Sequence, residues 1–546
     1  MREFLRRVAD DRLPHALLRR VPHGLLRLVA DGDDRLLRRV AATRSPVLDR
    51  VLPAAGRAAD NSLLWMGVAG ALALTGDPRA RRAAMRGLVA VAITSATAHT
   101  IKAVTGRHRP PDGVAPLARR LRRAPVTTSF PSGHAASAAA FATGVALELP
   151  GVGLPLAGAA AAVAVSRVFT GAHHPSDVLA GAAIGVGLGV ATQRWWPRRP
   201  PVAARAARPR HEAPALPTGA GLVLVVNPAA GGSGEDIAAD VRAELPDAQV
   251  VLAGPDDDLD ELFTGAAHTA VVLGVAGGDG TVNLAARVAW ESGLPLFVVP
   301  GGTLNHFAAD VGVAGVAGAA AALRGGEAVA VDLGVVRTAT GDGAARVAAG
   351  VGGPRADAVF VNTCSVGVYV DLVRAREKLE TRIGKWPAAV VGLVQVLRHG
   401  SPTPMVVDGR RRRVWLLFAG NGHYAPPGMV PSHRPRLDDG LLDIRVVDGT
   451  RPFTRLRLVL AVATGTLATC RVYQAREART VRLRSPRGPI GLSLDGEVTR
   501  TGTAITIGKS DRALIVYRPA ESGTTTGPDG GPGAGPGRLE WRRPGR

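Results

Sequence analysis

Residues 166–177 read SRVFTGAHHPSD and join two apolar segments, GLPLAGAAAAVAVSRVF (153–169) and VLAGAAIGVGLGVATQRWW (178–196). Three segments of the same kind precede them: SLLWMGVAGALALTG (62–76), MRGLVAVAITSATAHTI (85–101) and AASAAAFATGVALEL (135–149). All are rich in Gly and Ala and uncharged over most of their length. A membrane-spanning helix needs about 20 apolar residues, or about 17 at the short end, and small residues let such helices pack closely. We therefore expect residues 61–196 to form an all-α membrane bundle, with a buried bundle in a soluble protein as the alternative.

The composition suits a membrane-associated protein of more than one domain. The 546 residues carry a formal net charge of +22, and only 4% are aromatic. A basic balance matches the anionic surface of a membrane, whereas the chain has no zinc-finger spacing and no aromatic-interleaved basic stripe. We therefore expect no nucleic-acid partner. Cys364 and Cys470 lie far apart and form neither a metal-binding nor a redox motif.

The regions outside the bundle differ in composition and in hydrophobic pattern. Residues 1–60 are Arg-rich with leucines at helical spacing, which suits either solvated amphipathic helices or helices lying on a bilayer surface. Residues 197–219 form a Pro/Arg-rich linker. Strands and helices alternate over 220–325, which predicts an α/β domain, and 326–518 is strand-rich. Residues 519–546 are of low complexity, so we expect a disordered tail.

Three polar clusters flank the apolar segments: KAVTGRHRP (102–110), PSGH (131–134) and the opening stretch. Arginine and lysine side chains neutralise phosphate oxygens, and a serine and a glycine N–H at the start of a helix add further donors. A neutral histidine can attack phosphorus while an aspartate orients its ring. A second histidine can protonate the leaving oxygen. The clusters therefore supply each role that a phosphohistidine mechanism requires.

In order and spacing, these clusters resemble the type 2 phosphatidic acid phosphatase superfamily, whose pattern is K-x6-RP, PSGH and SR-x5-H-x3-D. That superfamily also contains soluble acid phosphatases and haloperoxidases, but the apolar segments favour its membrane lipid-phosphatase branch. The resemblance implies a nucleophile His173, a general acid His134 and an orienting carboxylate Asp177, and it requires no cofactor. His174 is off the pattern. The implied phosphate-binding residues are Lys102, Arg109, Ser132, Gly133 and Arg167.

The order of the clusters predicts the topology. They fall at the end of the second apolar segment, the start of the third, the end of the fourth and the start of the fifth, so all lie on one side of the bundle. The loops DPRARRAAMR (77–86) and QRWWPRRPP (193–201) lie on the other side and are basic. By the positive-inside rule, that side is cytoplasmic and the phosphatase site faces outward. The same number of membrane crossings places the Arg-rich residues 1–60 outside, which conflicts with the positive-inside rule.

A second constellation follows the linker. Three apolar strands each end in a Gly-rich turn: NPAAGGSG (227–234), AGGDGTVN (276–283) and PGGTLNHFAAD (300–310). Turns at the carboxyl ends of parallel strands bind phosphates, because backbone N–H groups can approach the ligand closely. One such turn could be a simple tight turn, but three within a short span indicate a nucleotide site.

Residues 222–518 resemble the diacylglycerol kinase and sphingosine kinase catalytic superfamily, through these turns and through DLG (332–334), FAGNG (418–422), RLDDGLLD (436–443) and LDGE (494–497). The resemblance implies an α/β nucleotide domain and a β-sandwich domain, with ATP and Mg²⁺ as kinase substrate and cofactor. The implied ATP-binding residues are Asn227, Gly277, Gly278, Asp279, Gly280, Thr281, Asn283 and Thr303.

The same resemblance implies a base and a metal site. Asp495 and Glu497 would activate the lipid hydroxyl, with Glu497 as the preferred proton acceptor. Asp439, with backbone carbonyls near Arg436 and Leu441, would hold a structural Mg²⁺. For Asp495-Gly496 the alternative is a simple hairpin turn, which Asp-Gly favours. Ala276 and His306 depart from the family pattern, where a glycine and an acidic residue are common.

We therefore predict a bifunctional, multi-pass protein of the cell membrane. An extracytoplasmic phosphatase would hydrolyse a lipid phosphate, either a monoester or a diphosphate. A cytoplasmic kinase would phosphorylate a lipid alcohol such as diacylglycerol, and the kinase domain is a candidate homodimer interface. The alternatives are a chain with one active half, the other being a regulatory or lipid-binding module, a basic membrane scaffold, or a soluble haloperoxidase-like enzyme.

Overall fold

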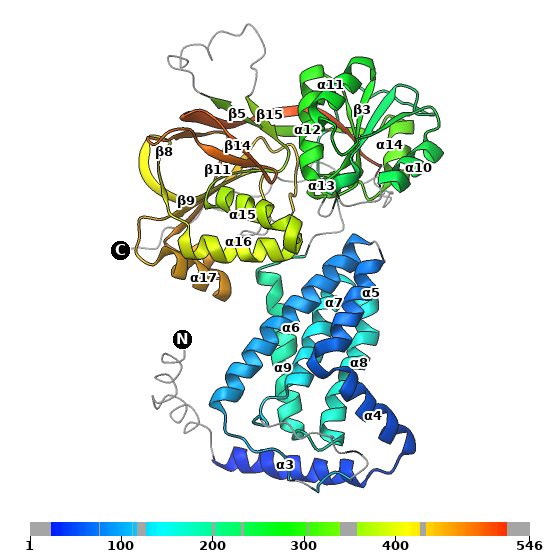
Figure 1. The fold of residues 1–546 in the computed structure, drawn as a ribbon, viewed down its shortest axis with the longest axis vertical. Coiled ribbons are helices and arrows are strands. Elements are labelled where there is room, and N and C mark those ends of the chain that lie inside the picture. Colours follow the sequence, from blue (N-terminus) through cyan, green and yellow to red (C-terminus); the bar gives the residue numbers. More distant parts are fainter. Residues whose placement is uncertain are drawn as a thin grey trace, which may run out of the picture.

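The computed structural model describes residues 23–75, 77–111, 113–116, 119, 127–198, 203–230, 234–302, 305–338, 357–425 and 433–520. The predicted tail from position 521 on, the first 22 residues and Thr303 lie outside the described residues. A helical bundle occupies one end of the molecule, and an α/β domain and a β-sandwich lie side by side at the other (Figure 1). The predicted fold class is confirmed.

The helical bundle contains each of the predicted apolar segments as a helix. By length and composition, three described stretches can cross a membrane: Arg79–Val104, Pro150–Phe169 and Pro175–Arg194. The other two helices are shorter, and the one that includes residues 135–148 lies at the centre, packed against three of its neighbours. The bundle helices are α5 (Leu63–Leu74), α6 (Pro78–Val104), α7 (Gly133–Glu148), α8 (Pro150–Phe169) and α9 (Pro175–Ala191).

Glycines bring α9 against the central helix α7. Gly181, Gly185 and Gly189 repeat every fourth residue and are buried on one face of α9. A Cβ atom on Gly181 would overlap the carbonyl oxygen of Ser132, and one on Gly185 would overlap that of Ala136. The absence of side chains therefore allows the two backbones to touch, as in other closely packed membrane helices.

Two N-terminal helices, α3 (His23–Ala42) and α4 (Pro46–Ala58), belong to the predicted Arg-rich region. Helix α3 lies across the end of the bundle and contacts α8 and α9 (Figure 1). Leu37 is buried there, while Leu28 and Leu36 remain exposed. One face of α3 thus packs on the bundle, and part of its apolar surface stays exposed.

The α/β domain is a parallel sheet with strands in the order β2-β1-β3-β4. The strands are β1 (Leu222–Val226), β2 (Gln249–Leu252), β3 (Val272–Gly277) and β4 (Leu296–Pro300). The accompanying helices are α10 (Gly234–Glu244), α11 (Leu259–Thr269), α12 (Asp279–Ser292), α13 (His306–Val311) and α14 (Val316–Gly325). The continuous apolar strands predicted from the sequence are buried along almost their whole length, except for the edge strand β2.

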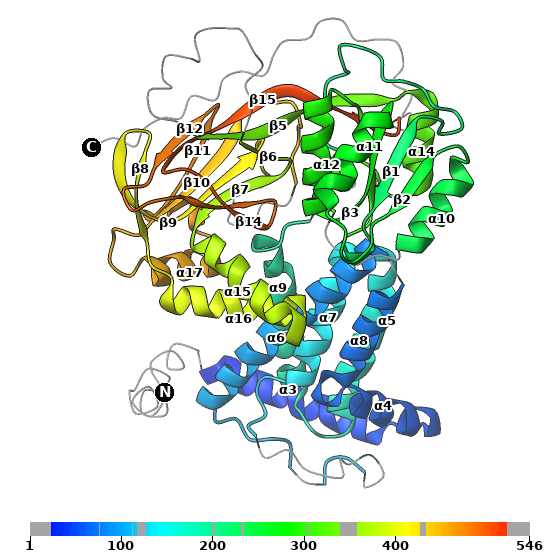
Figure 2. The same cartoon turned by 45° about the horizontal axis from the view of Figure 1, so that its top comes forward.

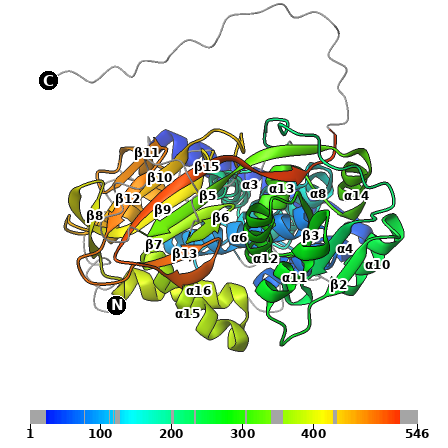
Figure 3. The same ribbon diagram turned by 90° about the horizontal axis from the view of Figure 1, so that it is seen from above.

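The β-sandwich is antiparallel and continues into the α/β sheet through one long strand, β15 (Ala504–Tyr517) (Figure 3). This strand pairs with β5 and β12 of the sandwich, and Val516 pairs in parallel with Leu296 of β4. The other strands are β5 (Ala328–Thr338), β6 (Ala358–Phe360), β7 (Thr363–Gly367), β8 (Thr403–Val407), β9 (Arg410–Asn421), β10 (Leu442–Asp448), β11 (Tyr473–Ala478), β12 (Val481–Arg484), β13 (Gly491–Leu494) and β14 (Glu497–Arg500). Helices α15 (Val368–Ile383), α16 (Lys385–His399) and α17 (Thr454–Thr464) lie on the side of the sandwich toward the bundle (Figure 2).

The described part of the linker, from residue 203 on, runs along the two sheet domains. The Ala204 N–H donates to Asp310 O at 2.8 Å, and Arg205 O accepts from the Leu437 N–H at 2.9 Å. The Tyr517 hydroxyl donates to Pro214 O at 2.6 Å. The segment has little helix or strand, as predicted, but it is bonded to both domains.

Enlarging Gly185 tests the helix contact. Gly185→Leu should destabilise the bundle by about 2 kcal/mol or more, because the added side chain has to push α9 away from α7. Thermal unfolding of the purified chain in detergent measures the change. Gly187→Leu is the matched control, since a Cβ at Gly187 meets nothing within 4 Å. Equal effects of the two substitutions would contradict the close packing.

Candidate active sites

The first candidate site lies at the end of the bundle where α6 ends, α7 begins, α8 ends and α9 begins. The Ser132 N–H donates to the carbonyl of Asp177 at 3.0 Å, which joins the starts of α7 and α9. Lys102, near the end of α6, faces the same place, because a Cβ on Gly133 would lie 3.8 Å from its Nζ. The alternating direction of the helices thus brings together clusters that are far apart in the sequence.

His173 is the buried histidine of this site. Its Nε2 lies 3.4 Å from Nη1 of Arg109, and its Nδ1 lies 3.9 Å from Oδ2 of Asp177. Burial, with the nearby positive charge of Arg109, lowers the pKa of His173 to about 4, although Asp177 opposes the change. The imidazole is therefore neutral near pH 7, the form that has a nitrogen lone pair available for attack. The His174 backbone N–H donates to Asp177 at 2.9 Å.

Asp177 is buried and held from several sides. Its Oδ1 accepts from Nη1 of Arg107 at 2.6 Å, and its Oδ2 also accepts from the Ser129 hydroxyl. Neither Arg107 nor Ser129 was predicted as a site residue. Arg107 lies inside the KAVTGRHRP cluster, so its charge was visible in the sequence, but its partner was not. The two side chains fix the carboxylate that faces His173.

A further carboxylate reaches this network from α3. The Asp33 side chain is buried and accepts from Nη2 of Arg107 at 2.6 Å and from the Ser176 N–H at 2.8 Å. Arg107 therefore bridges Asp33 and Asp177. Helix α3 is thus part of the site, although residues 1–60 were predicted only as a separate amphipathic region.

His134, on the first turn of α7, pairs with a second unpredicted carboxylate. Its Nε2 lies 2.8 Å from Oδ1 of Asp60. Asp60 begins a short 3₁₀ turn, Asp60–Ser62, between α4 and α5. A carboxylate at this distance can orient the ring of His134.

Several buried side-chain atoms of the first site have no hydrogen-bond partner within the described part of the chain. They include two donors, the hydroxyl of Ser132 and Nε of Arg167, together with Nδ1 of His173 and of His174. Buried polar groups are nearly always paired, so unpaired donors beside Lys102 and Arg109 indicate the place of an anionic ligand.

The second candidate site lies at the carboxyl ends of the parallel strands. A Cβ on Gly302 would overlap Gly278, so two of the Gly-rich turns touch. The remaining Gly-rich turn, 227–234, contributes Asn227, which donates through Nδ2 to Thr281 Oγ1 at 3.0 Å. The predicted turns thus come together, with Thr303 outside the described residues.

Glu497 reaches this nucleotide turn from the sandwich. Its carboxylate lies against Gly280 so closely that a Cβ there would overlap Oε1. Asp495 and Gly496, both with positive φ, form the two-residue turn between β13 and β14. The hairpin alternative is therefore correct as a description of the backbone, and this hairpin is what carries Glu497 to the α/β domain.

Asp495 and Asp279 bind backbone groups. Asp495 accepts from the N–H groups of Val361, Asn362 and Thr363 at 2.6–2.9 Å. Burial, with the nearby negative charge of Asp279, raises the pKa of Asp495 to about 7, although these N–H bonds oppose the change.

Asp279 accepts from the N–H groups of His306 and Phe307 and from the Asn362 side-chain amide, each at 3.1 Å. Asn283 donates to Val359 O at 3.1 Å. These side chains hold the two domains together around the site.

The residues predicted to bind structural Mg²⁺ have other partners. Asp439 accepts from the ammonium group of Lys509 at 2.9 Å and from the Leu441 N–H at 3.0 Å. The side chain of Arg436 pairs with Asp438, while its carbonyl oxygen, the predicted ligand, faces the same space as Asp439: a Cβ on Gly422 would lie 3.4 Å from that carbonyl oxygen and 3.3 Å from Oδ2 of Asp439. Among the described residues, no group of three or more His, Cys, Asp or Glu side chains is placed to hold a metal ion.

Comparison with known proteins agrees with this architecture. Residues 83–201 match the family model of the PAP2 superfamily, 221–336 that of the diacylglycerol kinase catalytic domain, and 363–508 that of the YegS C-terminal NAD kinase beta sandwich-like domain. The chain therefore contains a PAP2-type helical domain followed by a diacylglycerol kinase-type catalytic domain and its β-sandwich.

Curated relatives match the phosphatase part. A decaprenylphosphoryl-5-phosphoribose phosphatase of Mycobacterium tuberculosis is 37% identical over 128 residues, which cover 23% of this chain and 67% of that protein. A lipid A 1-phosphatase of Rhizobium johnstonii is 41% identical over 64 residues, 12% of this chain and 26% of that protein. This chain thus spans about a quarter of the lipid A phosphatase. The chain belongs to the PAP2 superfamily through its helical bundle and carries a diacylglycerol kinase-family catalytic domain beside it.

Solved structures resemble each half separately. A putative diacylglycerol kinase from Bacillus anthracis covers 55% of this chain and 97% of its own length, with 21% identity and a TM-score of 0.40. A PAP2-type phosphatidylglycerolphosphate phosphatase from Bacillus subtilis covers 31% of this chain and 86% of its own length, with 22% identity and a TM-score of 0.26.

Removing the charge of Asp33 tests the link between α3 and the first site. Asp33→Asn should lower kcat for phosphate release by about ten- to a hundredfold with little change in KM, because Arg107 then holds Asp177 less firmly. Steady-state kinetics measure the change. Asp34→Asn, an exposed neighbour on the same helix, is the control and should leave kcat unchanged. A rise in KM alone would contradict a positioning role.

Proposed function

We propose that this protein is a bifunctional membrane enzyme. Its phosphatase removes phosphate from a lipid phosphate at one face of the membrane, and its kinase transfers phosphate from ATP to a lipid hydroxyl at the other face. The observation that carries the phosphatase assignment is the convergence of cationic and neutral donors, two of them buried and unpaired, around a neutral His173. The named relatives act on lipid-linked phosphates, which supports the same chemical class of substrate.

The phosphatase reaction would proceed in two balanced steps. His173 attacks phosphorus through Nε2, since Nδ1 faces Asp177, and the bond between phosphorus and the lipid oxygen breaks. His134 donates a proton to the departing oxygen. Water then attacks the phosphohistidine and gives its proton to His134. The P–N bond breaks, which releases phosphate and restores neutral His173. Lys102, Arg109 and Arg167 stabilise the phosphoryl oxygens throughout.

The kinase reaction would use Glu497 as the proton acceptor. Glu497 is an exposed residue whose carboxylate lies against Gly280 of the nucleotide turn, whereas Asp495 is occupied by backbone N–H groups. Glu497 would remove the proton of a lipid hydroxyl as that oxygen attacks the γ-phosphorus of ATP. Mg²⁺ bound with the nucleotide would neutralise phosphate charge, and ATP phosphates with one or two carboxylates can supply its ligands.

The placement of the kinase supports a two-sided arrangement. The phosphatase clusters lie at the start of α9, and the kinase half follows its other end, where Nε1 of Trp195 donates to Val462 O on α17 at 2.8 Å. Three large apolar side chains on or just before α17 are more than half exposed: Phe453, Leu456 and Leu460. An apolar helix face beside the end of a spanning helix is suited to contact the cytoplasmic leaflet, from which a lipid alcohol would be drawn.

Inactivating each site separately tests the assignment. His173→Ala should abolish phosphate release and leave ATP-dependent lipid phosphorylation intact, and Glu497→Gln should do the reverse. The purified chain is incubated with membrane lipid extracts, with and without Mg·ATP, and the lipids are followed by mass spectrometry. His174→Ala and the exposed Glu261→Gln are the matched controls. If the parent chain shows one activity alone, the other half is a regulatory or lipid-binding module.

The acidic limb of the phosphatase pH profile gives a second test. Because His173 loses its nucleophilic lone pair only below a pKa of about 4, kcat/KM should stay high as the pH falls and decline only near pH 4. Initial rates at saturating and low substrate across the acidic range measure the limb. A decline centred near the ordinary histidine pKa of about 6.5 would contradict the proposed state of His173.

A further inference from the structure

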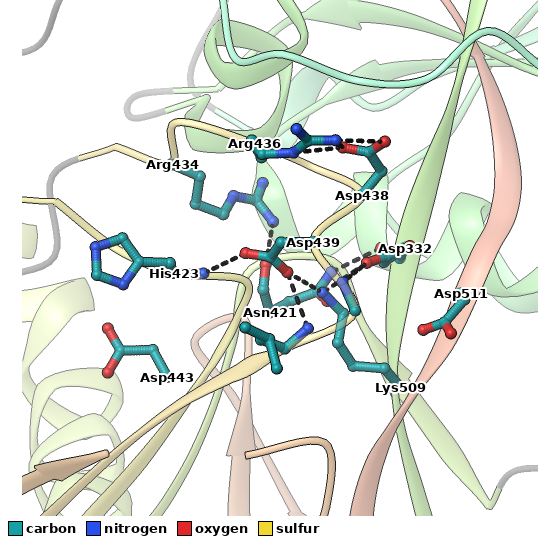
Figure 4. A network of polar contacts seen from close by, with 12 residues as sticks. Asp332, Asn421, His423, Arg434, Arg436, Asp438, Asp439, Asp443, Lys509 and Asp511 are labelled. Carbon is teal, nitrogen blue, oxygen red and sulfur yellow. Dashed lines mark hydrogen bonds and ion pairs between the residues drawn. The ribbon is translucent and has the colours of Figure 1, made fainter. Parts of the chain in front are cut away.

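A lysine ammonium group is buried between two carboxylates in the kinase half (Figure 4). Lys509 lies on β15, and only 2% of its side chain is exposed. Its Nζ is 2.8 Å from Oδ2 of Asp332 on β5 and 2.9 Å from Oδ1 of Asp439 in the segment before β10. A cation thus stands where the family resemblance places a metal ion.

The remaining partners of Asp439 and Asp332 are all hydrogen-bond donors. Asp439 accepts the N–H groups of Leu441 at 3.0 Å and His423 at 2.8 Å. Asp332 accepts those of Gly440 at 2.8 Å and Arg512 at 2.7 Å. An N–H group has no lone pair to offer a metal ion, whereas Mg²⁺ requires oxygen ligands at about 2.1 Å.

The charges around Asp439 also argue against a divalent ion at this site. The single positive charge of Lys509 already lies 2.8 Å from Asp332 and 2.9 Å from Asp439. A divalent ion at Asp439 would stand within a few ångströms of the ammonium group, where like charges repel strongly. The site therefore accepts either the lysine or a metal ion.

We propose that Lys509 is an internal cation that takes the place of the structural divalent ion in this kinase domain. The proposal rests on the family's kinase fold and leaves open whether the kinase is active. It separates two uses of metal: Mg²⁺ would accompany ATP, while the structural cation is covalently part of the chain. Removing Lys509 would leave two adjacent carboxylates, which is a site that a divalent ion can then fill.

The network reaches the candidate active site. Nδ2 of Asn421 donates to the carbonyl oxygens of Asp332 at 2.8 Å and Val361 at 3.0 Å. The N–H of Val361 in turn binds Asp495, the turn residue next but one to Glu497. Lys509 therefore stabilises the frame that presents the proposed base.

Thermal unfolding of the full chain in detergent, without nucleotide, tests the proposal. The Tm of the parent chain should be the same in EDTA and in Mg²⁺. Lys509→Met should lower the Tm by about 10 °C in EDTA, because two buried carboxylates lose their counter-charge. Added Mg²⁺ or Ca²⁺ should restore part of that loss. Lys378→Met, an exposed lysine on α15, is the matched control.

Two further measurements keep the proposal open to contradiction if Lys509→Met fails to fold. The double variant Lys509→Met/Asp439→Asn removes one charge of each sign, and its Tm should not respond to divalent ions. Binding of Mn²⁺ to the nucleotide-free parent chain, followed by electron paramagnetic resonance, should be absent at Asp439. A Tm of the parent chain that falls in EDTA, or Mn²⁺ binding that Asp439→Asn removes, would overturn the proposal.

Discussion

The phosphatase half depends on the close contact between α7 and α9. Because Gly181 and Gly185 carry no side chain, the two backbones touch, and the Ser132 N–H can bond to the carbonyl of Asp177. That contact joins the start of α7, where Ser132 lies, to the start of α9, where Asp177 lies. Helices held further apart would separate the polar residues at these two helix starts.

In both halves of the chain, one basic side chain neutralises two carboxylates. Asp177 is balanced by Arg107, which is shared with Asp33, and Asp439 is balanced by Lys509, which is shared with Asp332. In each case one cation joins two carboxylates from distant parts of the chain. Removing one member leaves an uncompensated charge in a poorly hydrated place, which is costly. Such bridges can therefore tie an outlying segment to a functional frame.

Much of the architecture could be predicted from the sequence because its signals are local. Apolar segments of helical length, strand–glycine turns and the spacing of PSGH to SRVFTGAHHPSD depend on neighbouring residues alone. The structure confirms the fold class and brings Lys102, Arg109, Arg167 and His173 to one end of the bundle. Their roles stay predictions. The structure bears out the hairpin interpretation of Asp495 and Gly496, while the role of Glu497 as a base stays a prediction.

The partners of these residues could not be predicted, because they are contributed across long separations in sequence. Asp33 and Asp60 lie in or beside an Arg-rich region whose amphipathic pattern says nothing of a site, and Lys509 is an unremarkable residue within a strand. The sequence by itself determined the helices, the strands, the turns and the chemical groups available at their ends. Only the tertiary structure decided which cation meets which carboxylate, because a buried charge takes its partner from whatever the fold brings within hydrogen-bond distance.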